Sequence, residues 1–294
     1  MSFVLRVGIH ANNPSLLVLS QNGLLERRLS AHDIGVEWVR IAAGARTVEY
    51  IGANLIQIGG TGLTPPIAAQ AKGIPLVYIA TSEARPVGGI YVRGDSPVTS
   101  VADLAGKTVS LGVGSWLQAL LATALDRAGL SWSDIIPLDL TEPESRQALL
   151  AGDIDAWVSG GGLRDDTGKF RAIANTGDLV SNPSVFFAGR DFAERNPEVI
   201  GIVARALDET DRWIAAHPAE AATILERVAG GPLNAGEWEA HIAKRPWGLK
   251  AVDEQFLAEQ QRAADLFYRF GLLPRQIDIR DAALARPVSF ERAA

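Results

Sequence analysis

Short apolar runs alternate with helix-like segments along the first two-thirds of this 294-residue chain. Each run is rich in Val, Ile or Leu and is followed by small or turn-forming residues; the first three are Val4–Ile9, Val36–Ile41 and Leu55–Ile58. Strand-like runs that alternate with helical segments are typical of βαβ units, in which helices cover a mostly parallel sheet. The alternation therefore restricts the fold to the α/β class.

The pattern begins a second time after the strand Leu76–Ala80, which predicts two lobes. The further strands that it predicts are Gly89–Val92, Thr108–Leu111, Ile136–Leu140, Ala156–Ser159, Ala172–Ala174 and Val185–Ala188, the last two completing a second sheet. From about Asp191 the chain is helical, with a helical hairpin expected over Asp253–Phe270. We predict that residues 1–90 and 189–294 form lobe 1 and that residues 91–188 form lobe 2.

Composition and charge exclude several classes of function. The net charge is −6 without a basic run, which argues against a nucleic-acid groove, and no apolar run is long enough to span a membrane. The chain has no cysteine, and no two of its four histidines stand four residues apart, so we expect neither a metal site nor a thiol nucleophile. Nucleotide and nucleophile-elbow fingerprints are absent, and we expect no cofactor and no catalytic residue.

Three loops that follow predicted strands share one composition of small and hydroxyl residues. They are HANNPS (10–15), GGTGLTPP (59–66) and GVGSW (112–116). In an open α/β sheet, ligands bind beyond the carboxyl ends of the strands, where helix N-termini offer unbonded N–H groups. Glycine lets the backbone approach a ligand closely, and hydroxyl groups add donors. The loops therefore predict a site for a small oxyanion, unless they are only turns.

Two larger side chains near these loops have a possible role in binding. Trp116 begins a helix beside the third loop, where an aromatic ring can form one wall of a pocket or pack in the core. Arg85 is the cation nearest to the predicted crossover between the lobes, and it either reaches an anion or is a solvated loop residue. His10, at the end of the first strand, is expected to be a ligand donor or a local hydrogen-bonding group rather than a catalytic base.

The chain resembles the solute-binding proteins of the nitrate/sulfonate/taurine ABC importers, and most closely the aliphatic-sulfonate-binding branch. The matching stretches cover nearly the whole chain in order: RVGIHANNPSL (6–16), GVEWV (35–39), GGTGLTPPIAAQAKGIPLVYIA (59–80), DSPVTSVADLAGKTVSLGVGS (95–115), ALDRAGLSWSDIIP (124–137), ALLAGDIDAWV (148–158) and EQQRAADLFYRFGLLPRQIDIR (259–280). The combination of G-x-T-G-x-T-P-P with D-S-P-[IV]-x-S-[VL]-x-D-L-x-G-K is rather specific.

The resemblance implies a periplasmic-binding-protein type II-like fold, with a mixed, mostly parallel sheet in each of two lobes, C-terminal helices and a ligand between the lobes. It also implies that loop amides and hydroxyls hold an anionic head group. Carried over by position, the ligand-binding residues are His10, Asn12, Gly60, Thr61, Gly62, Thr64, Gly114, Ser115 and Trp116, with Arg85 as a nearby cation. The implied partners are a small organic anion, an alkane- or arylsulfonate, and a membrane permease, for a protein that is expected to be a monomer.

Two departures from the family pattern concern the site. His10 stands where the family usually has Gln, which introduces a titratable group with an ordinary pKa of about 6.5. The second departure is DAWVSGGG (155–162), which lacks the W-D-P that ends the family's D-A-W-x-x-W-D-P, near Gly160. The ligand's identity therefore stays open among sulfonate, nitrate, carboxylate, phosphonate and sulfinate.

Two other functions and two compartments remain compatible with the sequence. The same fold hosts a desulfinase that acts on aromatic sulfinates. The resemblance implies that the chemistry of this enzyme needs a cysteine, and this chain has none. The other function that remains compatible with the sequence is that of a ligand sensor without a transport role. No signal peptide precedes Val4–Ile9, as expected both of a cytoplasmic protein and of a mature periplasmic protein behind a new Met. The resemblance favours the periplasm.

Overall fold

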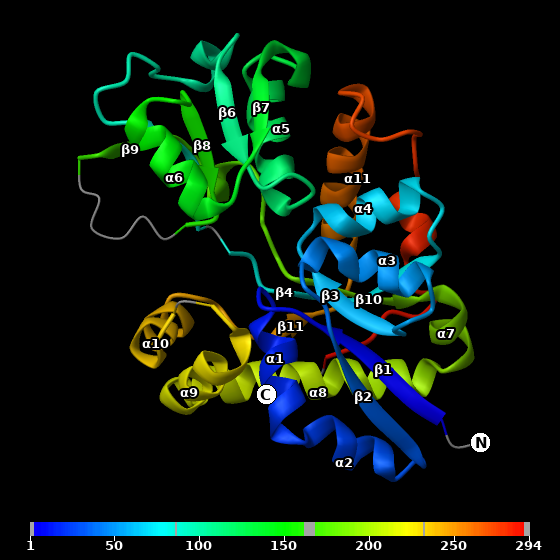
Figure 1. Cartoon of the computed structure of the whole chain (residues 1–294). Coiled ribbons are helices and arrows are strands. Elements are labelled where there is room, and N and C mark those ends of the chain that lie inside the picture. Colours follow the sequence, from blue (N-terminus) through cyan, green and yellow to red (C-terminus); the bar gives the residue numbers. More distant parts are fainter. Residues whose placement is uncertain (1–2, 86, 162–167, 232, 291–294) are drawn as a thin grey trace. The chain divides into compact units, whose positions relative to one another are not determined.

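The computed structural model describes residues 3–85, 87–161, 168–231 and 233–290 of the chain. These residues belong to two compact units (Figure 1). The first unit comprises Met1–Ala84, Pro183–Ala258 and Asp278–Ala294, and the second comprises Arg85–Asn182 and Glu259–Ile277. The chain therefore passes from one unit to the other four times. The lobe limits drawn from the sequence stay a prediction.

Among the described residues, the first unit contains a six-stranded sheet with the order β11-β4-β10-β3-β1-β2. Its strands are β1 (Phe3–Ile9), β2 (Ile34–Arg40), β3 (Ile58–Thr61), β4 (Leu76–Ser82), β10 (Val185–Gly189) and β11 (Leu249–Lys250). Strands β1, β2 and β3 are parallel, β10 is antiparallel to β3 and β4, and β11 is antiparallel to β4. The carboxyl ends of β1, β2 and β3 therefore meet at one edge.

Helices cover both faces of this sheet (Figure 1). The helices of the first unit are α1 (Pro14–Asn22), α2 (Leu24–Ser30), η1 (Gly44–Arg46), α3 (Thr47–Gly52), α4 (Thr64–Ala71), α7 (Arg190–Arg195), α8 (Pro197–Ala216), α9 (Pro218–Ala229), α10 (Ala235–Ala243) and η5 (Ile279–Ala282). α1, α2, α8 and α9 share one hydrophobic core with the sheet, in which Leu17, Val203 and Leu207 are fully buried. α3 and α4 lie on the other face. This double cover explains why β4 is buried at every position.

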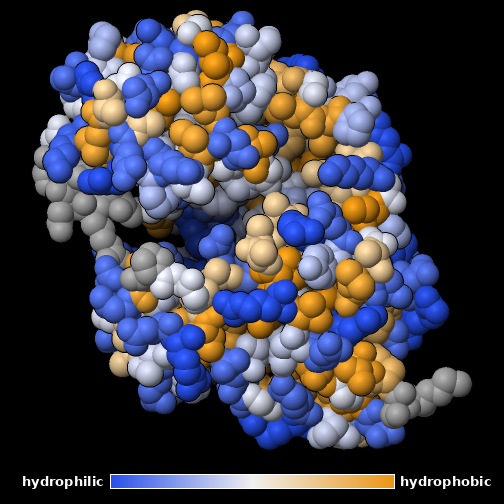
Figure 2. Space-filling view, in the orientation of Figure 1, coloured by the Kyte–Doolittle hydropathy of each residue, from blue (hydrophilic) through white to orange (hydrophobic). Residues whose placement is uncertain are grey.

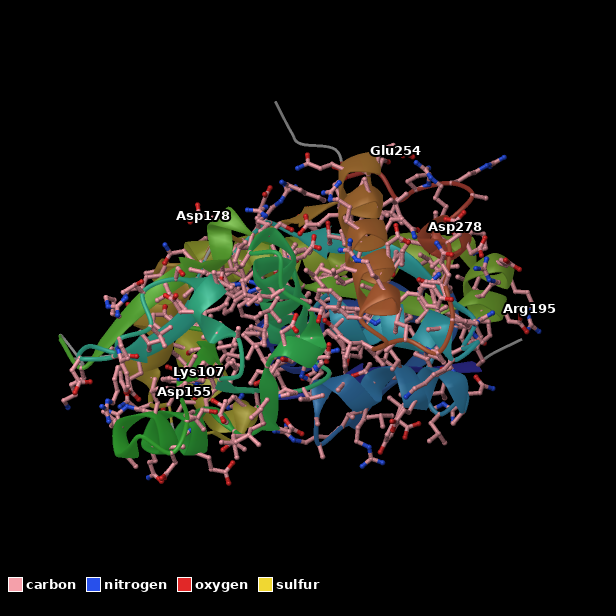
Figure 3. All side chains as sticks on the ribbon, turned by 90° about the horizontal axis from the view of Figure 1, so that it is seen from above. Lys107, Asp155, Asp178, Arg195, Glu254 and Asp278 are labelled. Atoms are coloured by element: carbon pink, nitrogen blue, oxygen red, sulfur yellow. The ribbon has the colours of Figure 1, made fainter. Side chains whose placement is uncertain are left out.

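The second unit contains, within its described part, a five-stranded sheet with the order β7-β6-β8-β5-β9. Its elements are β5 (Gly89–Arg93), η2 (Val101–Leu104), β6 (Thr108–Leu111), α5 (Trp116–Arg127), η3 (Trp132–Asp134), β7 (Ile136–Asp139), α6 (Glu142–Ala151), β8 (Ala156–Ser159), β9 (Phe170–Asn175) and η4 (Thr176–Asp178). β6 is parallel to both β7 and β8, whereas β5 is antiparallel to β8 and β9. The ion pair Lys107–Asp155, at 3.7 Å, joins the starts of β6 and β8 (Figure 3). Each unit thus has the mixed sheet that the resemblance implies.

Several local predictions are confirmed, and three are wrong. The predicted strand Val4–Ile9, for example, lies within β1. The run Val185–Ala188 belongs to β10 of the first sheet, not to the second, because a strand buried on both faces carries no signal of which sheet it enters. The expected hairpin Asp253–Phe270 is one helix, α11 (Glu254–Arg269), since no Gly, Pro or Asn interrupts its sequence.

The third correction concerns the glycine-rich loop. Residues Gly59 to Thr61 form β3 itself, so the strand lies three residues later than predicted. A Cβ atom at Gly60 would stand 2.7 Å from Cδ1 of Phe186 and 2.8 Å from Nδ2 of Asn13. Glycine at this position therefore serves close packing against β10 and the start of α1.

The face shown in Figure 2 mixes hydrophilic and hydrophobic residues. None of the helices in the described residues is long and apolar enough to cross a membrane. Over the same residues, no group of three or more His, Asp or Glu side chains is arranged to hold a metal ion.

Candidate functional site

His10 lies at the end of β1 and connects three segments of the first unit. Its Nε2 donates to the carbonyl oxygen of Gly60 at 2.8 Å, and its Nδ1 accepts from the N–H of Asn12 at 3.2 Å. A Cβ atom at Gly44 would stand 2.8 Å from Cε1 of the ring, so η1 packs closely against it. Burial lowers the pKa of His10, an effect that the hydrogen bond to Gly60 partly offsets. The imidazole is therefore neutral and uses both nitrogens within the protein.

The loop between β3 and α4 is short and contains an unsatisfied hydroxyl group. Thr64 is the first residue of α4 and is buried, and its Oγ1 has no hydrogen-bond partner within the described structure. The Thr61 hydroxyl donates to the carbonyl of Gly62 at 2.9 Å. Pro65 and Pro66 follow Thr64 and carry no N–H, so the backbone donors at this helix end come from Gly62 to Thr64. This end can therefore donate to an anion mainly through the Thr64 hydroxyl.

The first loop ends at the start of α1. Asn13, which is buried, caps the helix by accepting from the N–H of Leu16 at 3.2 Å. Asn12, the residue singled out from the sequence, is exposed, and its backbone bonds to His10. The structure thus brings His10, Asn12 and the residues from Gly60 to Thr64 to one edge of the first sheet.

In the second unit, the loop between β6 and α5 satisfies most of its own donors. The Ser115 hydroxyl donates to the carbonyl of Gly112 at 2.6 Å and accepts from the N–H of Leu117. The N–H of Gly114 donates to Oε1 of Gln118, and the N–H of Val113 donates to a carboxylate oxygen of Asp139, both at 2.9 Å. A ligand anion at this loop would have to take the place of these acceptors. The sequence did not show that the donors of the loop are already bonded within the protein.

Trp116 and Arg85, both in the second unit, differ in their surroundings. Trp116 is half-buried at the first turn of α5, next to Gly160. Arg85 donates from Nε to the carbonyl of Asn182 at 2.9 Å, and its N–H donates to Ser181. Arg85 therefore joins the two chain segments that meet at the unit's border.

Sequence reasoning missed a pair of buried charges behind the first loop. Arg245 and Asp211 are both buried, and in the described structure Nε and Nη2 of Arg245 and Oδ1 of Asp211 have no hydrogen-bond partner. The guanidinium also lies over the ring of Trp247, 4.4 Å from its centroid. Burial raises the pKa of Asp211, which the charge of Arg245 partly offsets. The trace of this pair in the sequence is a single Arg before Pro-Trp-Gly at residues 245–248. This pattern alone does not indicate a buried pair of charges or any chemical function.

Comparison with known proteins identifies the family. The model of the family described as NMT1/THI5 like matches residues 30–221. The chain belongs to this family. It is 34% identical, over 94% of its length and 87% of the relative's, to the aliphatic sulfonates-binding protein of Escherichia coli (strain K12). The resemblance stated from the sequence is thereby confirmed at the level of the family.

Two solved structures match nearly the whole chain. One is the periplasmic aliphatic sulphonate-binding protein SsuA of Escherichia coli, with a TM-score of 0.84, 32% identity and coverage of 99% of this chain and 94% of that one. The other is the alkanesulfonate-binding protein SsuA of Xanthomonas axonopodis pv. citri bound to MOPS, with a TM-score of 0.79, 31% identity and coverage of 96% and 98%. These matches establish the periplasmic-binding-protein type II fold of the chain.

An enzyme shares the fold at lower identity. The desulfurization enzyme DSZB is 18% identical with a TM-score of 0.66, over 95% of this chain and 96% of that one. An identity this low shows a common fold and carries no information about chemistry. The two solved structures above, both more than 30% identical, are of binding proteins.

Proposed function

We propose that this chain is the substrate-binding component of an ABC importer and that its ligand is a small organic sulfonate. Two relatives above 30% identity that cover almost the whole chain are named for alkane- or aliphatic-sulfonate binding, and both matches extend over both units. Transfer of the ligand to a membrane permease and a location in the periplasm belong to the same proposal. Binding between the two lobes stays a prediction.

The ligand class is taken from these relatives, and its place at the β3–α4 loop is supported by the buried Thr64 hydroxyl, which has no partner among the described residues. A buried hydroxyl that makes no hydrogen bond costs about 1–3 kcal/mol, a cost that a ligand oxygen would remove. A sulfonate offers three acceptor oxygens and one delocalised charge, which uncharged donors at a helix N-terminus suit. We therefore assign the head group to the β3–α4 loop, with Thr61, Gly62 and Thr64 in contact with it.

The other sequence-derived residues take different roles in this proposal. His10 fixes the β1 end against β3 and so positions the β3–α4 loop, because both of its nitrogens are already bonded. Gly60 provides the carbonyl for that contact. Gly114 and Ser115 shape the β6–α5 loop, where Trp116 offers a surface for the organic part of the ligand. Arg85 is not assigned to the ligand, since its Nε and its backbone N–H donate to the carbonyls of Asn182 and Ser181.

The test is a binding survey with purified protein, using thermal shift and then isothermal titration calorimetry. The compounds are alkane- and arylsulfonates, aminosulfonates, nitrate, sulfate, carboxylates and sulfinates. A sulfonate at 100 times its Kd should add about 2.7 kcal/mol to the free energy of unfolding. Stabilisation by nitrate or carboxylates alone, or by no anion, would overturn the ligand class. Release of sulfite from a sulfinate would overturn the binding-protein assignment.

A further inference from the structure

Two buried side chains of opposite charge in the first unit lie close together without a direct ion pair. Arg245 follows α10, and Asp211 lies in α8. Burial is the main cause of the shifted pKa of each group, and the charge of the other partly offsets it, so the two groups are neighbours. In the part of the chain that the structure describes, Nε and Nη2 of Arg245 and Oδ1 of Asp211 make no hydrogen bond, and the two side chains form no ion pair. The two charges are therefore close but not bonded to each other.

A hydroxyl group of α1 belongs to the same cluster. Ser15 is the second residue of α1 and is fully buried. Burial raises the pKa of Asp211, and Arg245 and then Ser15 oppose this rise, so the hydroxyl lies near the carboxylate. Within the described residues, its Oγ nevertheless makes no hydrogen bond of ordinary geometry. The cluster thus brings together four unbonded polar atoms from α1, α8 and the segment between α10 and β11.

The charges of this cluster are balanced. Asp208, the other carboxylate close to Asp211, pairs with Arg212 at 2.7 Å, and its second oxygen accepts from the N–H of Leu249 at 2.9 Å. One positive and one negative charge then remain, on Arg245 and Asp211. A further anion would stand beside the carboxylate and a further cation beside the guanidinium, so burial of either ion would be unfavourable. A suitable partner is therefore a neutral group that both donates and accepts hydrogen bonds.

Contacts that are already present define the atoms left for this partner. The guanidinium lies over the ring of Trp247, with 4.4 Å between its Cζ and the ring centroid. Oδ2 of Asp211 accepts from the N–H of Gly248 at 3.3 Å. What stays unbonded is one edge of the guanidinium, which donates through Nε and Nη2, and one carboxylate oxygen, which accepts.

We propose that a buried water molecule joins Arg245, Asp211 and Ser15. Its lone pairs accept from the N–H groups of Nε and Nη2, and its O–H groups donate to Oδ1 of Asp211 and to Oγ of Ser15. Globular proteins bury about one water per 27 residues, and each makes about three hydrogen bonds with polar groups that lack other partners. The water removes the cost of burying these polar atoms without hydrogen bonds.

This water also positions the start of α1. Two residues before Ser15, the buried Asn13 caps the helix by accepting from the N–H of Leu16 at 3.2 Å. Nδ2 of Asn13 would lie 2.8 Å from a Cβ atom at Gly60. The bridge therefore connects α8 and the segment before β11 with the first loop of the candidate site. The three bridged side chains act as positioning residues for this loop, whichever ligand the protein binds.

A high-resolution crystal structure of the ligand-free protein tests the water directly. We expect a water oxygen within about 3.2 Å of Oδ1 of Asp211 and of Nε or Nη2 of Arg245. A direct hydrogen bond between these two side chains, or a cluster without a water, would overturn the proposal. Crystals soaked in sodium bromide test for an anion, because bromide has a measurable anomalous signal. A bromide peak at the guanidinium would overturn the assignment of a neutral partner.

Hydrogen exchange tests the positioning role, with Ser15→Ala as the variant. The N–H groups of Leu16 and Leu17 donate to Asn13 at the start of α1. We expect them to exchange about tenfold faster or more than in the wild-type protein, because the helix start loses one of its anchors. Unchanged exchange at these two residues would overturn the positioning role. An increase of equal size at the amides of β4 would show a general loss of stability and would also overturn it.

The matched control is Ser145→Ala in α6 of the second unit. The Ser145 hydroxyl is also fully buried and has no partner among the described residues. This variant should leave the exchange of Leu16 and Leu17 as it is in the wild-type protein. Equal acceleration by Ser145→Ala and Ser15→Ala would mean that the effect does not come from the cluster, and the positioning role would fall.

Discussion

His10 donates a hydrogen bond from Nε2 to the carbonyl oxygen of Gly60 at 2.8 Å, and this contact joins the end of β1 to the middle of β3. The second ring nitrogen accepts from the N–H of Asn12, which fixes the course of the first loop. Only a neutral imidazole with its proton on Nε2 can make both bonds, because Nδ1 must be an acceptor. The protonation state of His10 is therefore linked to the conformations of the loop that follows β1 and the loop that follows β3.

The first prediction concerns pH. Burial lowers the pKa of His10, so between the folded pKa and about 6.5 the unfolded chain binds a proton that the folded chain does not. Unfolding then takes up a proton, and the free energy of unfolding falls as the pH decreases below about 6.5, by at most about 1.4 kcal/mol per pH unit for this group. Urea unfolding at several pH values between about 7.5 and 5 measures this slope.

His10→Gln isolates this contribution, because glutamine can still donate to Gly60 and does not titrate. We expect its slope over this range to be smaller than that of the wild-type protein. The control is His32→Gln, since His32 approaches Glu198 only at 4.0 Å and is partly exposed. An unchanged slope in His10→Gln would contradict the assignment of this pH dependence to His10.

The sequence predicted those elements that depend on local patterns. The strand at Val4–Ile9, for example, is read from its hydrophobic run. The sheet that contains β10 could not be predicted in this way, because it depends on contacts with β3 and β4, which are distant in sequence. Local sequence patterns therefore predict where a strand lies better than they predict which strands pair with it.

The same limit applies to the candidate site. The loops were predicted because small residues follow strands, but which donors are already bonded depends on side chains such as Gln118 and Asp139. Glycine at residue 60 was taken as a sign of a loop, whereas its role is set by the ring of Phe186. Arg245 and Asp211 are both buried and interact, although they lie in separate segments of the chain. Nothing in the sequence of either segment predicts this interaction.

The second prediction tests the packing role of Gly60. Gly60→Ala would place a methyl group within 3.0 Å of Phe186 and Asn13, and we expect it to lower the free energy of unfolding by about 1–3 kcal/mol. Gly35→Ala is the matched control, since Gly35 also lies in a strand and its Cβ would meet only Cγ2 of Val4, at 3.5 Å. Chemical denaturation compares the two variants, and equal stabilities would argue against tight packing at Gly60.

The third prediction separates stability from binding at Thr64. Thr64→Val keeps the shape of the side chain and removes a buried hydroxyl that has no partner in the described structure. We expect the ligand-free protein to be as stable as the wild type or more stable, by up to about 1 kcal/mol, and sulfonate affinity to fall about tenfold or more. Thermal unfolding and calorimetry measure the two effects separately.

Thr176→Val is the matched control, because the Thr176 hydroxyl in the second unit is also buried and has no partner among the residues that the structure describes. This variant should change stability in the same direction and leave affinity unchanged. If Thr64→Val bound sulfonates as tightly as the wild-type protein, the head group would not contact this hydroxyl, and the assignment of the β3–α4 loop would be wrong.

The last prediction concerns the buried charges of Arg245 and Asp211. Removal of one member leaves the other charge buried without its counterpart, so Arg245→Met should lower the free energy of unfolding by about 3 kcal/mol or more. Asp211→Asn keeps an oxygen for the N–H of Gly248, which now bonds Oδ2 at 3.3 Å, but leaves the guanidinium unpaired. Each single variant is therefore expected to be destabilised.

The double variant distinguishes coupling from two independent losses. When Arg245→Met and Asp211→Asn are combined, no unpaired charge remains, so the loss should be at least about 1 kcal/mol smaller than the sum of the single losses. Urea unfolding of the four proteins gives this coupling energy directly. Arg212→Met with Asp208→Asn serves as the comparison cycle, since their ion pair, at 2.7 Å, has an exposed guanidinium and should couple more weakly. Strict additivity for Arg245 and Asp211 would mean that the two charges do not interact, and that the pKa of Asp211 is raised by its burial and by the charge of Asp208 without an opposing effect of Arg245.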